Sequence, residues 1–197
     1  MEYLRFFAVA FIPLLVAMEP IGVIPVYMSV TGVLGESERR RVLSYSIVTA
    51  AIITLVFLVV GKAVFTVLGI TTADFQIAGG LVLLSIAVSD IVQTVRGIVP
   101  ARPAAAGIGI VPLGTPLIAG PEALTTILML NDLYGLSVTA LAIIANLFIV
   151  WLVLSWSDAI VRYIGENGAR GISKVISLLL AAIAVMMIRR GLGFFMG

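Results

Sequence analysis

The chain has 197 residues, of which 61% are hydrophobic and only 11% are charged, and its mean hydropathy is +1.22. Because soluble domains carry roughly 25% charged residues, this composition predicts a single domain, residues 1–197, that lies in a lipid bilayer. A net charge of +2 does not favour nucleic-acid binding, and the absence of cysteine and histidine argues against disulfides, thiolate chemistry and imidazole metal sites. We therefore expect no metal, no cofactor and no nucleic-acid partner.

Six apolar segments are long enough to cross a hydrocarbon core of about 30 Å, which takes about 20 helical residues. The polar residues 36–41 form the clearest loop, and the first segment is too long and too rich in proline for a signal peptide. The sequence thus predicts an all-α membrane fold with six transmembrane helices, over residues 4–31, 42–61, 75–95, 105–130, 136–157 and 172–190.

The first and fourth segments carry related proline motifs 96 positions apart. Each has two prolines five positions apart with a glycine between them: Pro20, Gly22 and Pro25 in the first, and Pro116, Gly120 and Pro121 in the second. Proline removes a backbone donor and clashes with the preceding turn, so both helices should be discontinuous. An opened helix survives in a membrane only where protein or a water-filled cavity covers it, and matched breaks point to the substrate site of a transporter.

The two motifs divide the chain into halves of three segments each, residues 1–97 and 98–197. Because three is odd, the second half enters the membrane from the opposite side, which predicts two inverted three-helix repeats. The connections after segments one, three and five carry eight Lys and Arg residues and the opposite side carries four, so both termini are predicted outside.

Three stretches resemble the MarC/SnatA family of six-helix inner-membrane proteins of prokaryotes: residues 19–25, residues 75–80, and residues 116–121 followed by Thr125 and Thr126. The resemblance covers essentially the whole chain. It implies a multi-pass transporter in the cell membrane that moves small neutral amino acids, of the glycine and alanine class, coupled to the proton gradient. The sequence departs from the family pattern at Glu19, Val23 and Glu122, which leaves the substrate range open.

The breaks themselves suggest how a carboxylate could bind. Pro25 and Pro121 are placed to restart helices whose free N–H groups face the middle of the membrane, and Gly22 and Gly120 leave the backbone open to a ligand. Hydroxyls one turn further can contact the ligand or bond to their own helix, as Ser and Thr in membrane helices usually do. The predicted substrate-binding residues are Glu19, Pro20, Gly22, Pro25, Ser29, Thr115, Gly120, Pro121, Thr125 and Thr126.

Glu19 is the carboxylate placed deepest in a predicted break. Acidic groups within a membrane are usually functional, so Glu19 is the candidate for proton coupling or for holding a substrate ammonium. The alternative is that Glu19 is a structural cap on the amides that the break at Pro20 frees. Glu122 is interpreted as a first-turn residue that complements the helix dipole, and Asp90 as a residue that reaches water from its helix end.

Small and polar residues in other segments admit two interpretations. Gly79 and Gly80 mark either a close helix crossing or the lining of the substrate path, and Asn146 reads first as a hydrogen-bonding contact between helices, with path lining as the alternative.

Three functions compete: a secondary transporter working by alternating access at a midplane site, a small-solute channel with half-helices, and an intramembrane enzyme. The enzyme is the weakest, because no histidine, cysteine or aspartate pair stands at equivalent depth, so we expect no catalytic residues. The sequence favours the transporter, as a possible homo-oligomer.

Overall fold

The computed structural model describes residues 2–32, 34–95 and 105–196, and every element in these ranges is helical. The described part of the chain therefore has the all-helical architecture that its apolar segments predicted. The elements in chain order are α1 (Glu2–Met18), α2 (Pro20–Thr31), α3 (Glu36–Leu68), α4 (Thr72–Val95), α5 (Ala105–Ile108), the irregular helical segment η1 (Gly109–Ile118) and α6 (Pro121–Met196).

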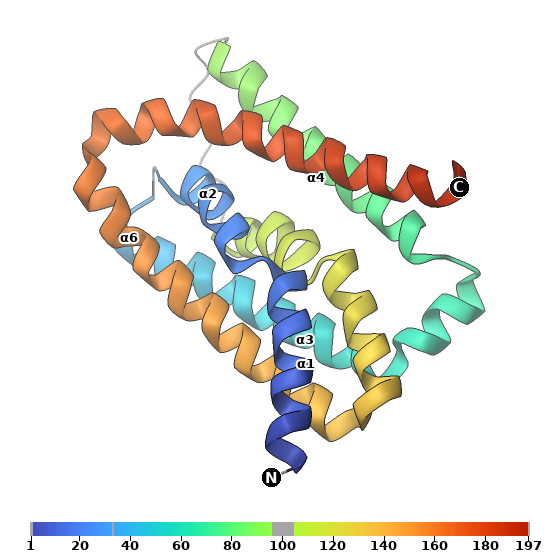
Figure 1. Cartoon of the computed structure of the whole chain (residues 1–197). Coiled ribbons are helices and arrows are strands. Elements are labelled where there is room, and N and C mark those ends of the chain that lie inside the picture. The colour runs from blue at the N-terminus through green and yellow to red at the C-terminus, as the bar shows by residue number, and fades with distance from the viewer. Residues whose placement is uncertain (1, 33, 96–104, 197) are drawn as a thin grey trace.

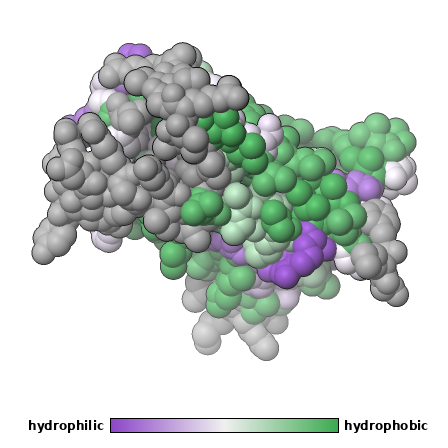
Figure 2. Space-filling model, turned by 90° about the horizontal axis from the view of Figure 1, so that it is seen from above, coloured by the Kyte–Doolittle hydropathy of each residue, from purple (hydrophilic) through white to green (hydrophobic). Residues whose placement is uncertain are grey.

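Within the described ranges, four helical stretches are long and apolar enough to cross a membrane: Phe6–Thr31, Glu36–Leu68, Thr72–Ser89 and Pro121–Ser157. A shorter apolar helix covers Ala106–Ile118. On the face shown in Figure 2, hydrophobic residues cover most of the described surface, and hydrophilic residues are confined to small patches. Such a surface is expected of a protein whose solvent is lipid. The full count of six crossings stays a prediction.

The long helix α6 organises the bundle, since it contacts α1, α2, α3 and α4. Gly135 has a φ of 79°, a left-handed conformation that glycine adopts without strain, and it interrupts α6 after its first part. Figure 1 shows α6 reversing direction and ending in a C-terminal part, drawn in red, that lies alongside α4. Fully buried side chains from α1, α2, α4, η1 and α6 belong to one core, among them Leu14, Tyr27, Leu83, Leu113, Ile127 and Ile143.

The first proline motif breaks the helix at a single residue. Glu19 adopts a left-handed conformation, with φ 43° and ψ 57°, which ends α1 at Met18. Helix α2 then begins at Pro20, because proline suits the first helical position. The prediction that Pro25 restarts the helix was wrong, since Pro25 lies inside α2.

The second proline motif opens a longer stretch of backbone. Val111 and Thr115 in η1 have extended dihedral angles, with φ −129° and −145° respectively, and Ala119 is also non-helical. The amide of Ala119 donates to the carbonyl of Gly114 at 2.9 Å, and α6 starts at Pro121. Pro121 therefore does restart a helix, as its position in the motif predicted.

The polar residues 36–41 are not a loop, in contrast to the sequence expectation, but the first turns of α3. Glu36 and Glu38 lie at the N-terminus of this helix, where negative charge complements the helix dipole. Arg39 donates from Nε to the carbonyl oxygens of Thr31 and Leu34, both at 3.1 Å. The short connection is thus held by a side chain of the helix that follows it.

Glycines let α4 and the C-terminal part of α6 approach closely. A Cβ atom added at Gly80 would lie 2.8 Å from the carbonyl oxygen of Ala184, and one at Gly191 would lie 2.7 Å from that of Ala73. Small residues are common at helix contacts in membranes because lipid supplies no hydrophobic drive for association. This pairing positions the wall of the cavity described below.

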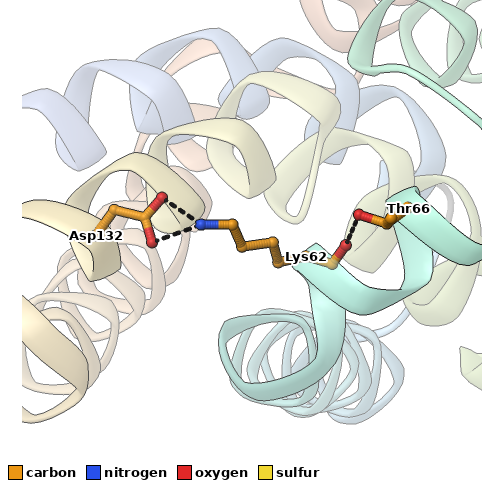
Figure 3. Close-up of polar contacts among 3 residues, drawn as sticks. All are labelled: Lys62, Thr66 and Asp132. Carbon is orange, nitrogen blue, oxygen red and sulfur yellow. Dashed lines mark hydrogen bonds and ion pairs between the residues drawn. The ribbon is translucent and has the colours of Figure 1, made fainter.

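An ion pair ties α3 to the first part of α6. Lys62 Nζ lies 3.1 Å and 3.0 Å from the two carboxylate oxygens of Asp132, and Figure 3 shows the ammonium pointing between them. The hydroxyl of Thr66 donates to the carbonyl of Lys62 one turn away. Both charged side chains are mostly exposed, so the pair orients two helices more than it stabilises them.

Helix α4 starts with a reciprocal cap. The amide of Asp74 donates to Thr71 Oγ1 at 3.2 Å, while the amide and the hydroxyl of Thr71 both donate to Asp74 Oδ2 at 2.7 Å. The two side chains thereby satisfy amides that a helix start leaves free.

Replacing Thr71 by alanine is expected to lower the free energy of unfolding by about 1 kcal/mol, the usual cost of losing such a cap. Thermal unfolding of the purified protein in detergent measures it. Thr66→Ala is the control, because the exposed Thr66 hydroxyl bonds only to the backbone of its own helix. Equal losses in the two variants would contradict a specific role for the cap.

Candidate functional site

Residues from both helix breaks line one cavity, of about 60 Å³. The first break contributes Glu19 and Gly22, and the second contributes Pro116, Gly120 and Pro121. The remaining lining comes from the ends of neighbouring elements, from α4 and from the C-terminal part of α6: Ala17, Met18, Val23, Gln76, Leu117, Glu122, Ile183, Met186 and Met187. The two interruptions of the chain thus meet at a single site that is apolar apart from a few polar groups.

Four of the predicted substrate-binding residues line this cavity, namely Glu19, Gly22, Gly120 and Pro121. The other six lie outside the lining: Pro20, Pro25, Ser29, Thr115, Thr125 and Thr126. Thr125 is an exposed residue whose hydroxyl donates to the carbonyl of Pro121 at 2.7 Å, so its own helix satisfies the hydroxyl. For Thr125 the ordinary structural role of a membrane-helix hydroxyl holds.

A small residue is needed at Gly22 and at Gly120 for different reasons. A Cβ added at Gly22 would lie 3.4 Å from Glu19 Oε2, an ordinary contact on the cavity side of α2. A Cβ at Gly120 would lie only 2.6 Å from the carbonyl oxygen of Pro116. Gly120 is therefore required by the folding of the break itself, whereas Gly22 leaves room in the cavity.

The two carboxylates that line the cavity, Glu19 and Glu122, differ in their partners. The carboxylate of Glu19 has no hydrogen-bond or ion-pair partner among the described residues, and α2 has no side-chain cap, so the capping alternative for Glu19 finds no support. Glu122 instead pairs with Arg190 from the C-terminal part of α6. Its side chain is 36% exposed and that of Arg190 is 47% exposed.

Gly79, Gly80 and Asn146 act in helix contacts and do not line the cavity. A Cβ at Gly79 would lie 3.2 Å from Pro116 Cβ, so Gly79 packs behind the second break. Asn146 is fully buried, and its Nδ2 donates to the carbonyl of Phe11 in α1 at 3.2 Å. This bond agrees with the reading of Asn146 as a contact between helices.

Sequence reasoning missed most of the wall opposite the breaks. Gln76 was visible as a polar residue in an apolar segment, and it stands within one of the stretches that carry the family resemblance. Ile183, Met186 and Met187 follow a spacing of three and four residues, which places them on one helix face. That pattern also fits any buried helix face, so it identified no site. Asp90 has a side chain outside the described set.

Comparisons with known proteins agree over the whole length. The family described as "MarC family integral membrane protein" matches residues 4–196. The UPF0056 membrane protein MJ0972 of Methanocaldococcus jannaschii is 30% identical, over 98% of this chain and 89% of its own. The UPF0056 inner membrane protein YhgN of Escherichia coli K12 is also 30% identical, over 93% of this chain and 94% of its own. No solved structure matches the chain.

Proposed function

The chain belongs to the MarC family of integral membrane proteins, and we propose that it is a secondary transporter of small zwitterionic amino acids, of the glycine and alanine class. Proton coupling and alternating access at a midplane site are part of the proposal. The observation that carries it is the cavity where the two interrupted helices meet. Matched half-helices around one site are the arrangement that secondary transporters use to bind solutes inside a membrane.

The size and lining of the cavity support a small ligand. A volume of about 60 Å³ holds a few water molecules or a solute of few atoms. Most of its walls are apolar, from residues such as Met18, Ile183 and Met187, so the few polar groups set the orientation of a ligand. The family resemblance supplies the amino-acid class.

An amino acid has complementary partners at the two breaks. The amides of Glu122 and Ala123 precede the first hydrogen bond at the start of α6, which the amide of Leu124 donates to the carbonyl of Gly120 at 3.0 Å. Free amides at a helix start, together with its positive dipole end, suit a carboxylate. The unpartnered carboxylate of Glu19, on the other break, suits the ammonium. A proton that competes with the ammonium for Glu19 would couple the two fluxes.

The proposal includes six crossings in two inverted halves, with both termini outside. Because the chain has no cysteine, single cysteines report its topology without background. A membrane-impermeant maleimide applied to intact cells should label Gly193→Cys, and it should label Ser37→Cys only after the membrane is opened. The reverse pattern would overturn the orientation, and labelling of both positions from one side would overturn the inverted arrangement.

Uptake into liposomes tests the transport function. Purified protein in proteoliposomes should accumulate labelled glycine or alanine when a pH gradient is imposed, and initial rates should saturate with substrate. Flux that never saturates and never exceeds equilibration would favour the channel instead. If the proteoliposomes show neither uptake nor exchange of any small amino acid, the proposal is refuted.

A further inference from the structure

Arg190 lies at the end of the cavity wall formed by the last part of α6. Ile183, Met186 and Met187 line the cavity, and Arg190 follows Met187 by three positions and Met186 by four. Residues at this spacing share one face of a helix, so Arg190 lies on the cavity side, one turn beyond the lining. Its guanidinium pairs with Glu122, which is itself part of the lining.

This ion pair neutralises the negative charge of Glu122, which would otherwise repel the carboxylate of the substrate. Glu122 directly follows Pro121, in the first turn of α6, beside the amides that receive the substrate carboxylate in the proposed binding mode. Two like charges a few ångströms apart in a partly dehydrated site repel by about 1–4 kcal/mol. With Glu19 unpaired and Glu122 uncompensated, the cavity would favour cations and reject the carboxylate of a zwitterion.

We infer that Arg190 is a specificity residue: by neutralising Glu122, it allows a cavity that contains two carboxylates to accept a zwitterion in preference to an amine. This inference rests on the proposed transport function. Glu19 then supplies the one uncompensated charge, for the ammonium, and the paired Glu122 leaves the opposite end of the cavity open to a carboxylate.

Alanine and alaninamide separate the two ends of the ligand, because alaninamide keeps the ammonium and replaces the carboxylate with a neutral amide. Isothermal titration of the purified protein should show that the wild type prefers alanine. In Arg190→Gln, binding of alanine should fall about tenfold or more, while binding of alaninamide stays or improves. The preference between the two ligands reverses because the negative charge of Glu122 is exposed to the ligand.

The double variant decides between charge compensation and a structural role for Arg190. Removing both charges, in Glu122→Gln with Arg190→Gln, should restore the preference for alanine, since no uncompensated carboxylate remains beside the amides. The exposed pair of Lys62 and Asp132 lies outside the cavity lining and provides a matched control. Lys62→Gln should leave the ratio of alanine to alaninamide binding unchanged.

The outcomes also separate this inference from the proposed function. A wild type that binds neither ligand and transports no amino acid would refute the proposed function. A wild type that prefers alanine, together with an Arg190→Gln variant that keeps the same preference, would refute the role of Arg190 alone. Failure of the double variant to regain the preference, despite intact folding by thermal unfolding, would show that Arg190 acts through structure and would overturn the inference.

Discussion

Replacing Gly120 by alanine is expected to destabilise the protein by about 1–3 kcal/mol, because the added methyl group has no space. Its Cβ would lie 2.6 Å from the carbonyl oxygen of Pro116 and 3.2 Å from that of Leu117, so the backbone of the second break would have to move. Gly120 is buried, and no flexible side chain can yield in its place. The break would lose the geometry that starts α6 at Pro121.

Gly22→Ala is the matched variant, because Gly22 lines the same cavity from the other break. Its new Cβ would make only ordinary contacts, at 3.4 Å and 3.6 Å from atoms of Glu19, and alanine favours the helix in which it lies. We expect Gly22→Ala to unfold at or above the wild-type temperature while binding substrate more weakly. If thermal unfolding placed both variants at the wild-type temperature, the tight backbone packing at Gly120 would be refuted.

The two breaks were predictable because proline acts through local sterics. Two prolines in one apolar segment leave few ways to continue a helix, and the chain opens at both motifs. Which proline restarts the helix was less predictable. Pro25 stays inside α2, as Pro13 stays inside α1, so a proline within an apolar segment does not by itself end the helix, and the break falls instead at the left-handed Glu19. A left-handed glutamate has no signature in sequence.

Contacts between residues on different sides of the cavity could not be predicted from local sequence patterns. Glu122 and Arg190 lie 68 positions apart, and neither segment carries a sequence feature that predicts their contact. Gly79 and Gly80 were open to two interpretations, because a close crossing depends on which helices become neighbours. Ser29 and Thr126 were chosen for their hydroxyls, but a hydroxyl in a membrane helix says little about the direction in which it points. The tertiary arrangement of the helices determines these contacts and side-chain directions.

Glu19 is the group on which proton coupling should depend. The other carboxylates with described side chains are engaged: Glu36 with Arg40, Glu38 with the Gly35 amide, Asp74 with Thr71, Glu122 with Arg190, and Asp132 with Lys62. Glu19 lines the cavity without such a partner. A carrier without histidine needs a carboxylate that can exchange a proton in its site.

Glu19→Gln keeps the shape of the side chain and a hydrogen-bonding oxygen but cannot release a proton. We expect this variant to lose accumulation of glycine driven by a pH gradient, since proton and ammonium no longer compete for one charge. It should still exchange labelled for unlabelled glycine across the membrane, at higher substrate concentrations, because the second break is unaltered. Proteoliposomes with an imposed gradient measure the first property and counterflow without a gradient measures the second. Accumulation at the wild-type level would assign coupling to another group, and loss of both activities in a folded variant would make Glu19 a binding residue alone.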